Sequence, residues 1–304
     1  MSYRIEYMKI KGYLFAIISA VSYGLIPLFI LPIKAINFPM DTALFYRFFI
    51  SALFLLAYLM YKKETIKVDR KEFFILLLLG VFYALSAEFL FLGYDYLSPG
   101  IASTILFVYP VIVALTMVFF FKERINKLTI VSLFITICGV FVLSTKDSVF
   151  SINFLGLAVT LICALFYALY IIVVNKAKIR GSSIKIAFYS LLFSSLYYLS
   201  KVILLNEPLV LPDVKFLLDI TVFSLVTTVL SMSTLVYAIK TIGSTPTSIM
   251  GALEPVVAVG VSVILFHENL TLSLILGVCF IISGVIINIV SEAVERAKSI
   301  EKQK

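Results

Sequence analysis

Long apolar segments, separated by short polar ones, follow one another from end to end of the chain. A run of roughly 18 or more apolar residues is long enough to cross about 30 Å of hydrocarbon as a helix. Barrel strands instead show short alternating patterns, whereas a helix satisfies its own backbone where water is absent. The pattern therefore predicts an all-α integral membrane protein. The ten predicted transmembrane helices span residues 12–32, 42–61, 73–93, 99–121, 128–145, 154–175, 185–205, 216–239, 245–266 and 272–291.

The composition agrees with this class and argues against several others. Of the 304 residues, 62% are hydrophobic and 14% are charged, whereas soluble domains carry about a quarter charged residues. The net charge of +8 does not indicate a nucleic-acid partner, because the basic residues lie in short segments between apolar runs. The three cysteines lie inside apolar runs and there is one histidine, so neither a disulfide nor a metal site is predicted. No cofactor is expected.

The basic residues are unevenly distributed between the two sides of the predicted membrane helices. With the N-terminus placed inside, 20 lysine and arginine residues fall on the inner side and 4 on the outer side. Cytoplasmic segments of membrane proteins carry an excess of these residues. The bias predicts a multi-pass protein of the cell membrane with both termini in the cytoplasm.

The two halves of the sequence resemble each other, which predicts an internal repeat. Most of the matched positions share an offset of 145 residues, and the first helix matches the sixth at an offset of 144. The matched pairs include Pro110 with Pro255, Glu123 with Glu268, Gly139 with Gly284, Ser103 with Ser248, and Tyr23 with Tyr167.

Each predicted repeat contains five of the ten crossings. Because five is an odd number, the second copy must enter the membrane in the opposite orientation. The fold is therefore expected to consist of two inverted five-helix repeats. Inverted repeats are typical of secondary transporters, because two related halves can open a site alternately to either side. The predicted division is 1–148 for the first repeat, 149–292 for the second and 293–304 for a cytoplasmic tail.

The repeated motif resembles the EamA family of the drug/metabolite transporter superfamily over nearly the whole chain. It comprises Ala102-Ser103, Pro110-Val111, Glu123 and Gly139-Val140, and recurs as Thr247-Ser248, Glu254-Pro255-Val256, Glu268 and Gly284-Val285, with Arg47-Phe48 resembling the family's Arg-Phe pair. The resemblance implies a ten-helix fold with a central cavity, driven by gradients rather than ATP. Members move amino acids, other metabolites, nucleotide sugars or drugs. This chain departs from a plain member in having Glu88 and Asp95, and in having Tyr109 rather than an acidic residue before Pro110.

Glu254 is the first candidate for substrate binding. It lies about nine residues, or roughly 14 Å, from the inner end of its predicted helix, and an ionisable group at that depth is a functional hypothesis by default. Pro255 follows, and a kink is predicted there and at Pro110. We expect Glu254 to bind a substrate amine or a coupling proton; the alternative is a protonated structural glutamate. The repeat maps Glu254 onto Tyr109, which could supply a hydroxyl or a ring face, or simply pack.

Arg47 and Glu88 form the second candidate group. They lie about 8 Å and about 9 Å inside the outer ends of adjacent predicted helices, so their matching depth predicts an ion pair. The pair is either structural, or it opens to receive a zwitterion whose carboxylate Arg47 binds. Hydroxyl residues on the predicted helix 216–239 indicate a polar cavity wall, or hydroxyls that bond their own helix. They are Ser224, Thr227, Thr228, Ser231, Ser233 and Thr234, of which Thr228 and Ser231 are taken as substrate-binding.

These features favour a secondary transporter of a small polar metabolite, with an amino acid or related compound as the leading substrate. The alternatives are an exporter of drugs or aromatic compounds and, in another class, a non-transporting membrane scaffold or receptor. An enzyme is not expected, because the chain has no P-loop, HExxH or G-x-S-x-G motif. The expected partners are the substrate and the lipid bilayer, with a proton as candidate coupling ion and a homodimer as one option for assembly.

Overall fold

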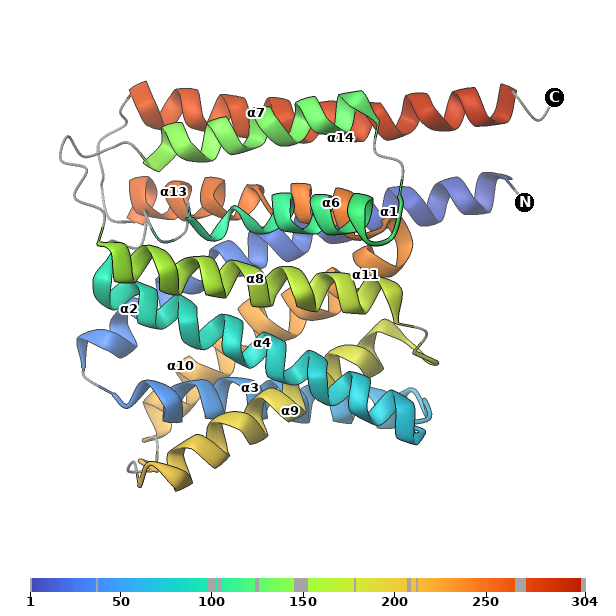
Figure 1. Cartoon of the computed structure of the whole chain (residues 1–304). Coiled ribbons are helices and arrows are strands. Elements are labelled where there is room, and N and C mark those ends of the chain that lie inside the picture. The colour runs from blue at the N-terminus through green and yellow to red at the C-terminus, as the bar shows by residue number, and fades with distance from the viewer. Residues whose placement is uncertain are drawn as a thin grey trace.

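The fold is described here from a computed structural model of the chain. The described residues are 2–36, 38–97, 102, 105–123, 126–144, 153–177, 179–206, 209–211, 213–265 and 272–301. They form helices and contain no strand, as the sequence predicts (Figure 1). The expected boundary between the repeats at residues 148 and 149, and the motif residues Ser103 and Glu268, lie outside these ranges.

Several helices begin and end within a few residues of their predicted bounds. They are α3 (Met40–Tyr61), α4 (Arg70–Tyr96), α7 (Lys127–Ser144), α8 (Phe154–Lys176) and α9 (Ser183–Leu204). Side-chain caps explain three of the starts, because Asp69, Asn153 and Ser182 each accept a hydrogen bond from a backbone N–H in the first turn of α4, α8 and α9. The last helix, α14 (Leu272–Glu301), continues through most of the segment predicted as a tail.

Other predicted helices are interrupted within the apolar run. The interrupted ones are α1 (Ser2–Gly24) with α2 (Ile26–Ala35), α10 (Val214–Phe223) with the π-helix η1 (Ser224–Leu230) and α11 (Ser231–Ile242), and α12 (Ser244–Met250) with α13 (Leu253–Leu265). Hydrophobic periodicity does not report such breaks, because the residues on both sides of each break are equally apolar. The interruptions matter here because two of them carry candidate site residues.

The two prolines predicted to kink their helices lie instead at helix starts. The helix α6 (Tyr109–Phe119) has Pro110 in its first turn, and Pro255 lies in the first turn of α13. Proline has no N–H to donate, and the first turn of a helix is where that donor is not needed. The chain therefore breaks before each proline rather than bending through it.

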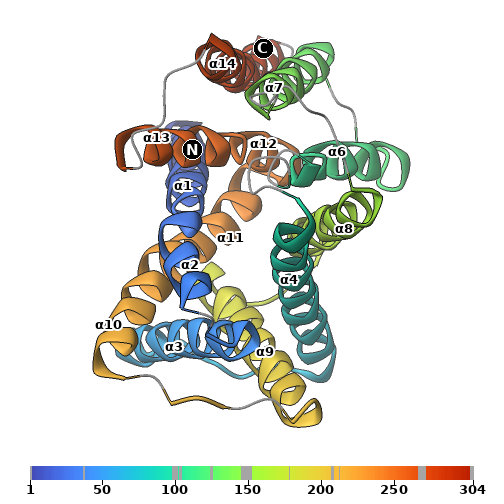
Figure 2. The same cartoon turned by 90° about the vertical axis from the view of Figure 1, so that its left-hand side faces the viewer.

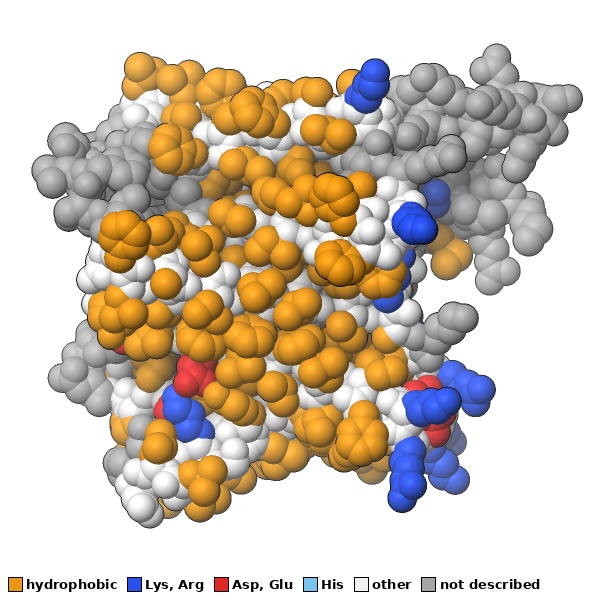
Figure 3. Space-filling view, viewed as in Figure 1, with side chains coloured by type: hydrophobic (Ala, Val, Ile, Leu, Met, Phe, Trp, Pro, Cys, Tyr) orange, Lys and Arg blue, Asp and Glu red, His pale blue; other side chains and the backbone are white. Residues whose placement is uncertain are grey.

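The helices are suited to a membrane by length and composition. Six helical segments, with the breaks described above included within a segment, are long and apolar enough to span it, and three apolar helices are shorter. The six are Met8–Ile30, Met40–Tyr61, Arg70–Tyr96, Phe154–Lys176, Ser183–Leu204 and Val214–Ile242. Figure 3 shows hydrophobic side chains over the middle of one face, with most of the visible lysine and arginine side chains gathered at one end. Both chain termini lie at that same end (Figure 1).

Helices that correspond to each other in the two halves pack together. The fifth and tenth predicted helices, α7 and α14, lie side by side in both views (Figure 1, Figure 2), and the second and seventh, α3 and α9, also pack along each other. In addition, α1 packs along α11 as α4 packs along α8. These two helix pairs are equivalent under the repeat, because α1 in the first half corresponds to α8 in the second and α4 corresponds to α11.

One hydrogen-bonding arrangement occurs twice, once in each half. The Ser51 hydroxyl donates to the Ser224 carbonyl oxygen at 3.3 Å, and the Ser194 hydroxyl donates to the Gly80 carbonyl oxygen at 2.8 Å. Both serines also donate to the carbonyl four residues earlier in their own helix. Ser194 follows Ser51 by 143 residues and Ser224 follows Gly80 by 144, so these contacts agree with the repeat found in the sequence.

Candidate substrate-binding site

Arg47 lies inside the bundle with 2% of its surface exposed. Its Nε donates to Thr228 Oγ1 at 2.7 Å and its Nη2 donates to Thr227 Oγ1 at 3.3 Å. Its Cζ also lies 4.4 Å from the centroid of the Phe223 ring, a cation–π contact. Among the described residues, Arg47 forms no ion pair. A buried cation is thus held by neutral groups, which is an arrangement that favours an arriving anion.

The predicted ion pair between Arg47 and Glu88 is wrong. The Glu88 carboxylate pairs with Lys201 Nζ at 2.8 Å and accepts a hydrogen bond from the Tyr197 hydroxyl. Lys201 also pairs with Asp41 at 2.9 Å. Helix arithmetic predicted the depth of the two charges but not the directions in which they point. In the structure α9 packs against both α3 and α4, and it supplies the cation that Glu88 binds.

Glu254 lies in the first turn of α13, directly after the break that follows α12, and is 9% exposed. The backbone of α1 approaches closely here: a Cβ added at Gly24 would lie 2.7 Å from the Glu254 carbonyl oxygen. No described cation pairs with Glu254. The break and the close approach of α1 together hold this carboxyl group inside the bundle.

Four tyrosines interact electrostatically with the Glu254 carboxyl group. They are Tyr23, Tyr83, Tyr109 and Tyr167. The Tyr167 ring is stacked on Tyr23, with centroids 6.1 Å apart, and meets the edge of Tyr109 at 4.7 Å. Tyr23 and Tyr83 also interact electrostatically with Arg47. The buried arginine and the buried glutamate therefore share two tyrosine neighbours.

Only part of this cluster is predicted from the sequence. Tyr109 is the predicted repeat counterpart of Glu254, and these two side chains interact in the structure. Tyr23 and Tyr167 match each other in the repeat but are not predicted as site residues. Their match at one offset was a usable signal, because residues beside the axis between two related halves contact their own counterparts. Tyr83 had no signal in the sequence.

The hydroxyl residues of η1 and α11 show both arrangements that the sequence left open. Thr228 and Thr227 accept hydrogen bonds from Arg47 on α3, and the Ser231 hydroxyl lies 3.3 Å from the Ser19 hydroxyl on α1. Ser224 and Thr234 donate to backbone carbonyls four residues earlier, and Thr227 does so as well as accepting from Arg47. Tyr109 likewise donates to a backbone carbonyl, that of Ser248 on α12, at 3.1 Å.

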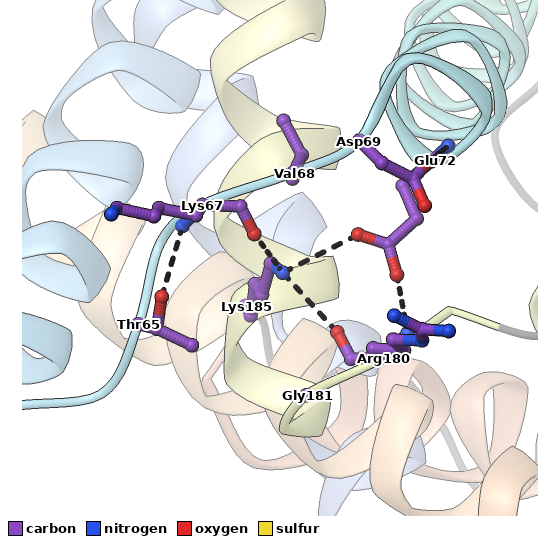
Figure 4. Close-up of a pocket in the computed structure, with 8 residues that line it drawn as sticks. All are labelled: Thr65, Lys67, Val68, Asp69, Glu72, Arg180, Gly181 and Lys185. Atoms are coloured by element: carbon purple, nitrogen blue, oxygen red, sulfur yellow. Dashed lines mark hydrogen bonds and ion pairs between the residues drawn. The ribbon is translucent and has the colours of Figure 1, made fainter.

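A separate pocket of about 360 Å³ lies where α4 and α9 begin, between the segments that precede them (Figure 4). Lys185 Nζ donates to the carbonyls of Lys67 at 2.6 Å and Arg180 at 3.2 Å, and lies 3.7 Å from the Glu72 carboxylate. Glu72 in turn accepts a hydrogen bond from the Arg180 backbone N–H at 2.8 Å. These contacts tie the two segments together. The described residues contain no group of acidic, histidine or cysteine side chains suited to a metal ion.

Replacing Lys185 by methionine is expected to lower the free energy of unfolding by about 3 kcal/mol, because it leaves the buried Glu72 carboxylate without its cation. Thermal unfolding in detergent measures the change. Lys240→Met is the control, because this exposed lysine also donates to a backbone carbonyl nearby, that of Gly181, and surface substitutions cost about 0.5 kcal/mol or less. Equal losses for the two variants would contradict the role given to Lys185.

The arrangement defines a class of protein. The described residues form the helices of a multi-pass membrane protein, in which both halves contribute to a set of buried polar side chains: an arginine, a glutamate and several tyrosines.

Comparison with known families identifies the chain more closely. Residues 10–145 and 154–290 each match the EamA-like transporter family, so the chain belongs to that family, and the resemblance seen in the sequence motif is confirmed. A search of curated proteins found no match. A solved structure titled only "Crystal structure of protein" is similar, with a TM-score of 0.75 and 15% identity over 91% of this chain and 96% of that one. Identity this low shows a shared fold alone.

Proposed function

We propose that this EamA-family protein is a gradient-driven transporter of small zwitterionic metabolites, with amino acids as the leading class. The observation that carries the proposal is that Arg47 and Glu254 are both buried and that, among the described residues, neither forms an ion pair. Two tyrosines interact with both of them. A small molecule with one carboxylate and one amine supplies what each residue lacks.

Each end of such a substrate has a partner with suitable chemistry. The Arg47 guanidinium binds carboxylates through charge-assisted hydrogen bonds. Glu254 accepts the ammonium group, and the surrounding tyrosine rings provide π faces that attract a cation. The same carboxyl group is a candidate for proton coupling, because no described cation holds it in the ionised form.

The proposed transport cycle relies on the relation between the two halves. We propose ten crossings arranged as two inverted repeats that divide near residues 148 and 149, with both termini in the cytoplasm. The two matched family segments, the paired packing of corresponding helices and the duplicated serine contacts support this proposal. Two related halves that exchange conformations would open the polar centre alternately to each side.

An exporter of aromatic cations is the second candidate function. The four tyrosines around Glu254 favour it, since an aromatic cage beside a carboxylate suits a cation with a flat apolar body. This candidate gives no function to Arg47. The two functions therefore differ in whether the ligand must carry a carboxylate.

Thermal unfolding of the purified protein in detergent, with a panel of possible ligands, distinguishes the two. The panel holds L-amino acids, organic acids, nucleosides and hydrophobic cations. A ligand at a hundred times its dissociation constant is expected to stabilise the protein by about 2.7 kcal/mol. Amino acids are expected to stabilise it, and uptake of the best one into liposomes under a pH gradient then tests transport. Stabilisation by hydrophobic cations alone would replace the amino-acid proposal with the exporter.

A further inference from the structure

The Arg47 side chain is held in one orientation by contacts on several sides. Thr228 and Thr227 bind one edge of the guanidinium. The Phe223 ring lies against its face, and Phe223 is itself stacked on Phe29 with centroids 5.3 Å apart. The charged group therefore has a defined direction inside the bundle.

The two threonines are neighbours in sequence and lie in the π-helix η1. A π-helix closes its hydrogen bonds over one residue more than an α-helix and frequently occurs at functional sites. Thr227 Oγ1 also donates its hydrogen to the Phe223 carbonyl oxygen at 2.9 Å. Its lone pairs are thereby left to accept from Arg47, so the hydroxyl acts as a fixed acceptor rather than a rotating group.

The threonines occupy only part of the hydrogen-bonding capacity of the guanidinium. A guanidinium carries five N–H donors in a rigid planar fork, and two neighbouring donors can bind both oxygens of one carboxylate. The bonds to Thr228 and Thr227 use Nε and one hydrogen of Nη2. Among the described residues, no hydrogen-bond partner lies at the edge formed by Nη1 and the second Nη2 hydrogen.

We infer that Thr227 and Thr228 are positioning residues that clamp one edge of Arg47 and present its Nη1–Nη2 edge to the carboxylate of the substrate. The inference rests on the proposed function and assigns the substrate carboxylate to one edge of one side chain. Tyr23 and Tyr83 interact with both Arg47 and Glu254.

The energetics of burial support this reading of the threonines. A buried charge held only by neutral groups is costly, and its cost falls when a counter-ion arrives. The clamp satisfies enough of the donors to keep Arg47 folded inward without a substrate. It supplies no negative charge, so the attraction for a carboxylate is retained.

The experiment compares L-amino acids with the corresponding L-amino acid amides, which keep the amine and side chain but lack the carboxylate. Dissociation constants are measured by thermal unfolding in wild type and in the Thr227→Val/Thr228→Val double variant. Wild type is expected to prefer acid over amide by about ten-fold or more, since a hydrogen bond to a charged group contributes about that factor. The double variant is expected to lose this preference while its affinity for the amides stays within about two-fold.

Matched variants separate positioning from folding. Thr234→Val removes a hydroxyl from the same run of helices that bonds only its own backbone, and it should keep the wild-type preference. Thr227→Ser and Thr228→Ser retain the acceptor oxygen and should keep it too. The acid-to-amide ratio compares two ligands on the same sample, so partial loss of folded protein does not alter it.

The outcomes for the inference and for the proposed function differ. A wild-type preference for the acid that persists in the double valine variant would overturn the clamp and leave the proposed function intact. A wild type that binds amino acids and amides equally would overturn carboxylate recognition by Arg47, and the clamp with it. Binding of no amino acid would overturn the amino-acid proposal itself.

Discussion

Replacing Glu254 by glutamine is expected to reduce transport by about 100-fold or more while the protein still folds. Glutamine keeps the shape of the side chain and its capacity for hydrogen bonds, but it can neither balance an ammonium group nor release a proton. A charge-assisted bond to a buried carboxylate contributes up to about 3 kcal/mol, which corresponds to roughly two orders of magnitude in affinity. Counterflow of a radiolabelled amino acid in liposomes measures the loss.

The control for this variant is the same substitution at an exposed glutamate. Glu123 lies after α6, where its carboxylate pairs with Lys176 at 2.6 Å and its side chain is 43% exposed. Glu123→Gln is expected to retain transport, since exposed ion pairs contribute about 1 kcal/mol or less. Unfolding temperatures and gel filtration report whether each variant folds. Wild-type counterflow by a folded Glu254→Gln protein would exclude this residue from substrate binding and from proton coupling.

Replacing Gly251 by alanine is expected to lower the free energy of unfolding by about 2 kcal/mol in the wild-type protein but to cost much less in a Tyr109→Phe background. The reference for the double variant is Tyr109→Phe itself, because that change also removes the hydrogen bond to the Ser248 carbonyl. The new Cβ would collide with the Tyr109 hydroxyl, which lies directly against Gly251 at the break between α12 and α13. Inserting a methyl group into a packed interior typically destabilises a protein by about 1 to 3 kcal/mol. Thermal unfolding in detergent is the measurement.

The second substitution, Tyr109→Phe, makes the test specific for this contact. In Tyr109→Phe/Gly251→Ala the colliding oxygen is gone, and the remaining neighbours of the new Cβ are tight but tolerable, at 3.1 Å or more. The control is Gly260→Ala in α13, because a Cβ there would have no neighbour within 4 Å. If Gly251→Ala and Gly260→Ala were equally stable, the Tyr109 hydroxyl could not lie against the helix break.

The lengths of uninterrupted helices followed closely from the sequence. The apolar runs that became α3, α4, α8 and α9 are bounded by charged or turn-forming residues. Capping side chains such as Asp69 and Ser182 mark two of the starts. The interrupted helices were not predicted, because a break inside the hydrocarbon region leaves the composition on both sides unchanged. Only Pro110 and Pro255 indicated that their helices are irregular, and they predicted kinks within helices rather than the first turns of new helices.

Several residues that the repeat relates to each other make matching contacts in the structure. Tyr23 and Tyr167, matched by sequence, are stacked on each other, and Tyr109 interacts with its counterpart Glu254. Ser51 and Ser194 make corresponding bonds in the two halves. Sequence comparison could locate such pairs because residues close to the axis between related halves are near their own copies. It could not identify Tyr83, whose position in the cluster depends on how α4 packs.

Sequence patterns are sufficient to predict a helical membrane protein with a repeated EamA motif, and to place Arg47 and Glu254 deep in apolar segments. Hydrophobic length and charge distribution carry this information directly, because the bilayer sets both. The partner that each side chain meets follows only from tertiary packing: threonines for Arg47, Lys201 for Glu88 and tyrosines for Glu254. Helix arithmetic gives the depth of a side chain, whereas its direction and its neighbours depend on how every helix is rotated and packed against the others.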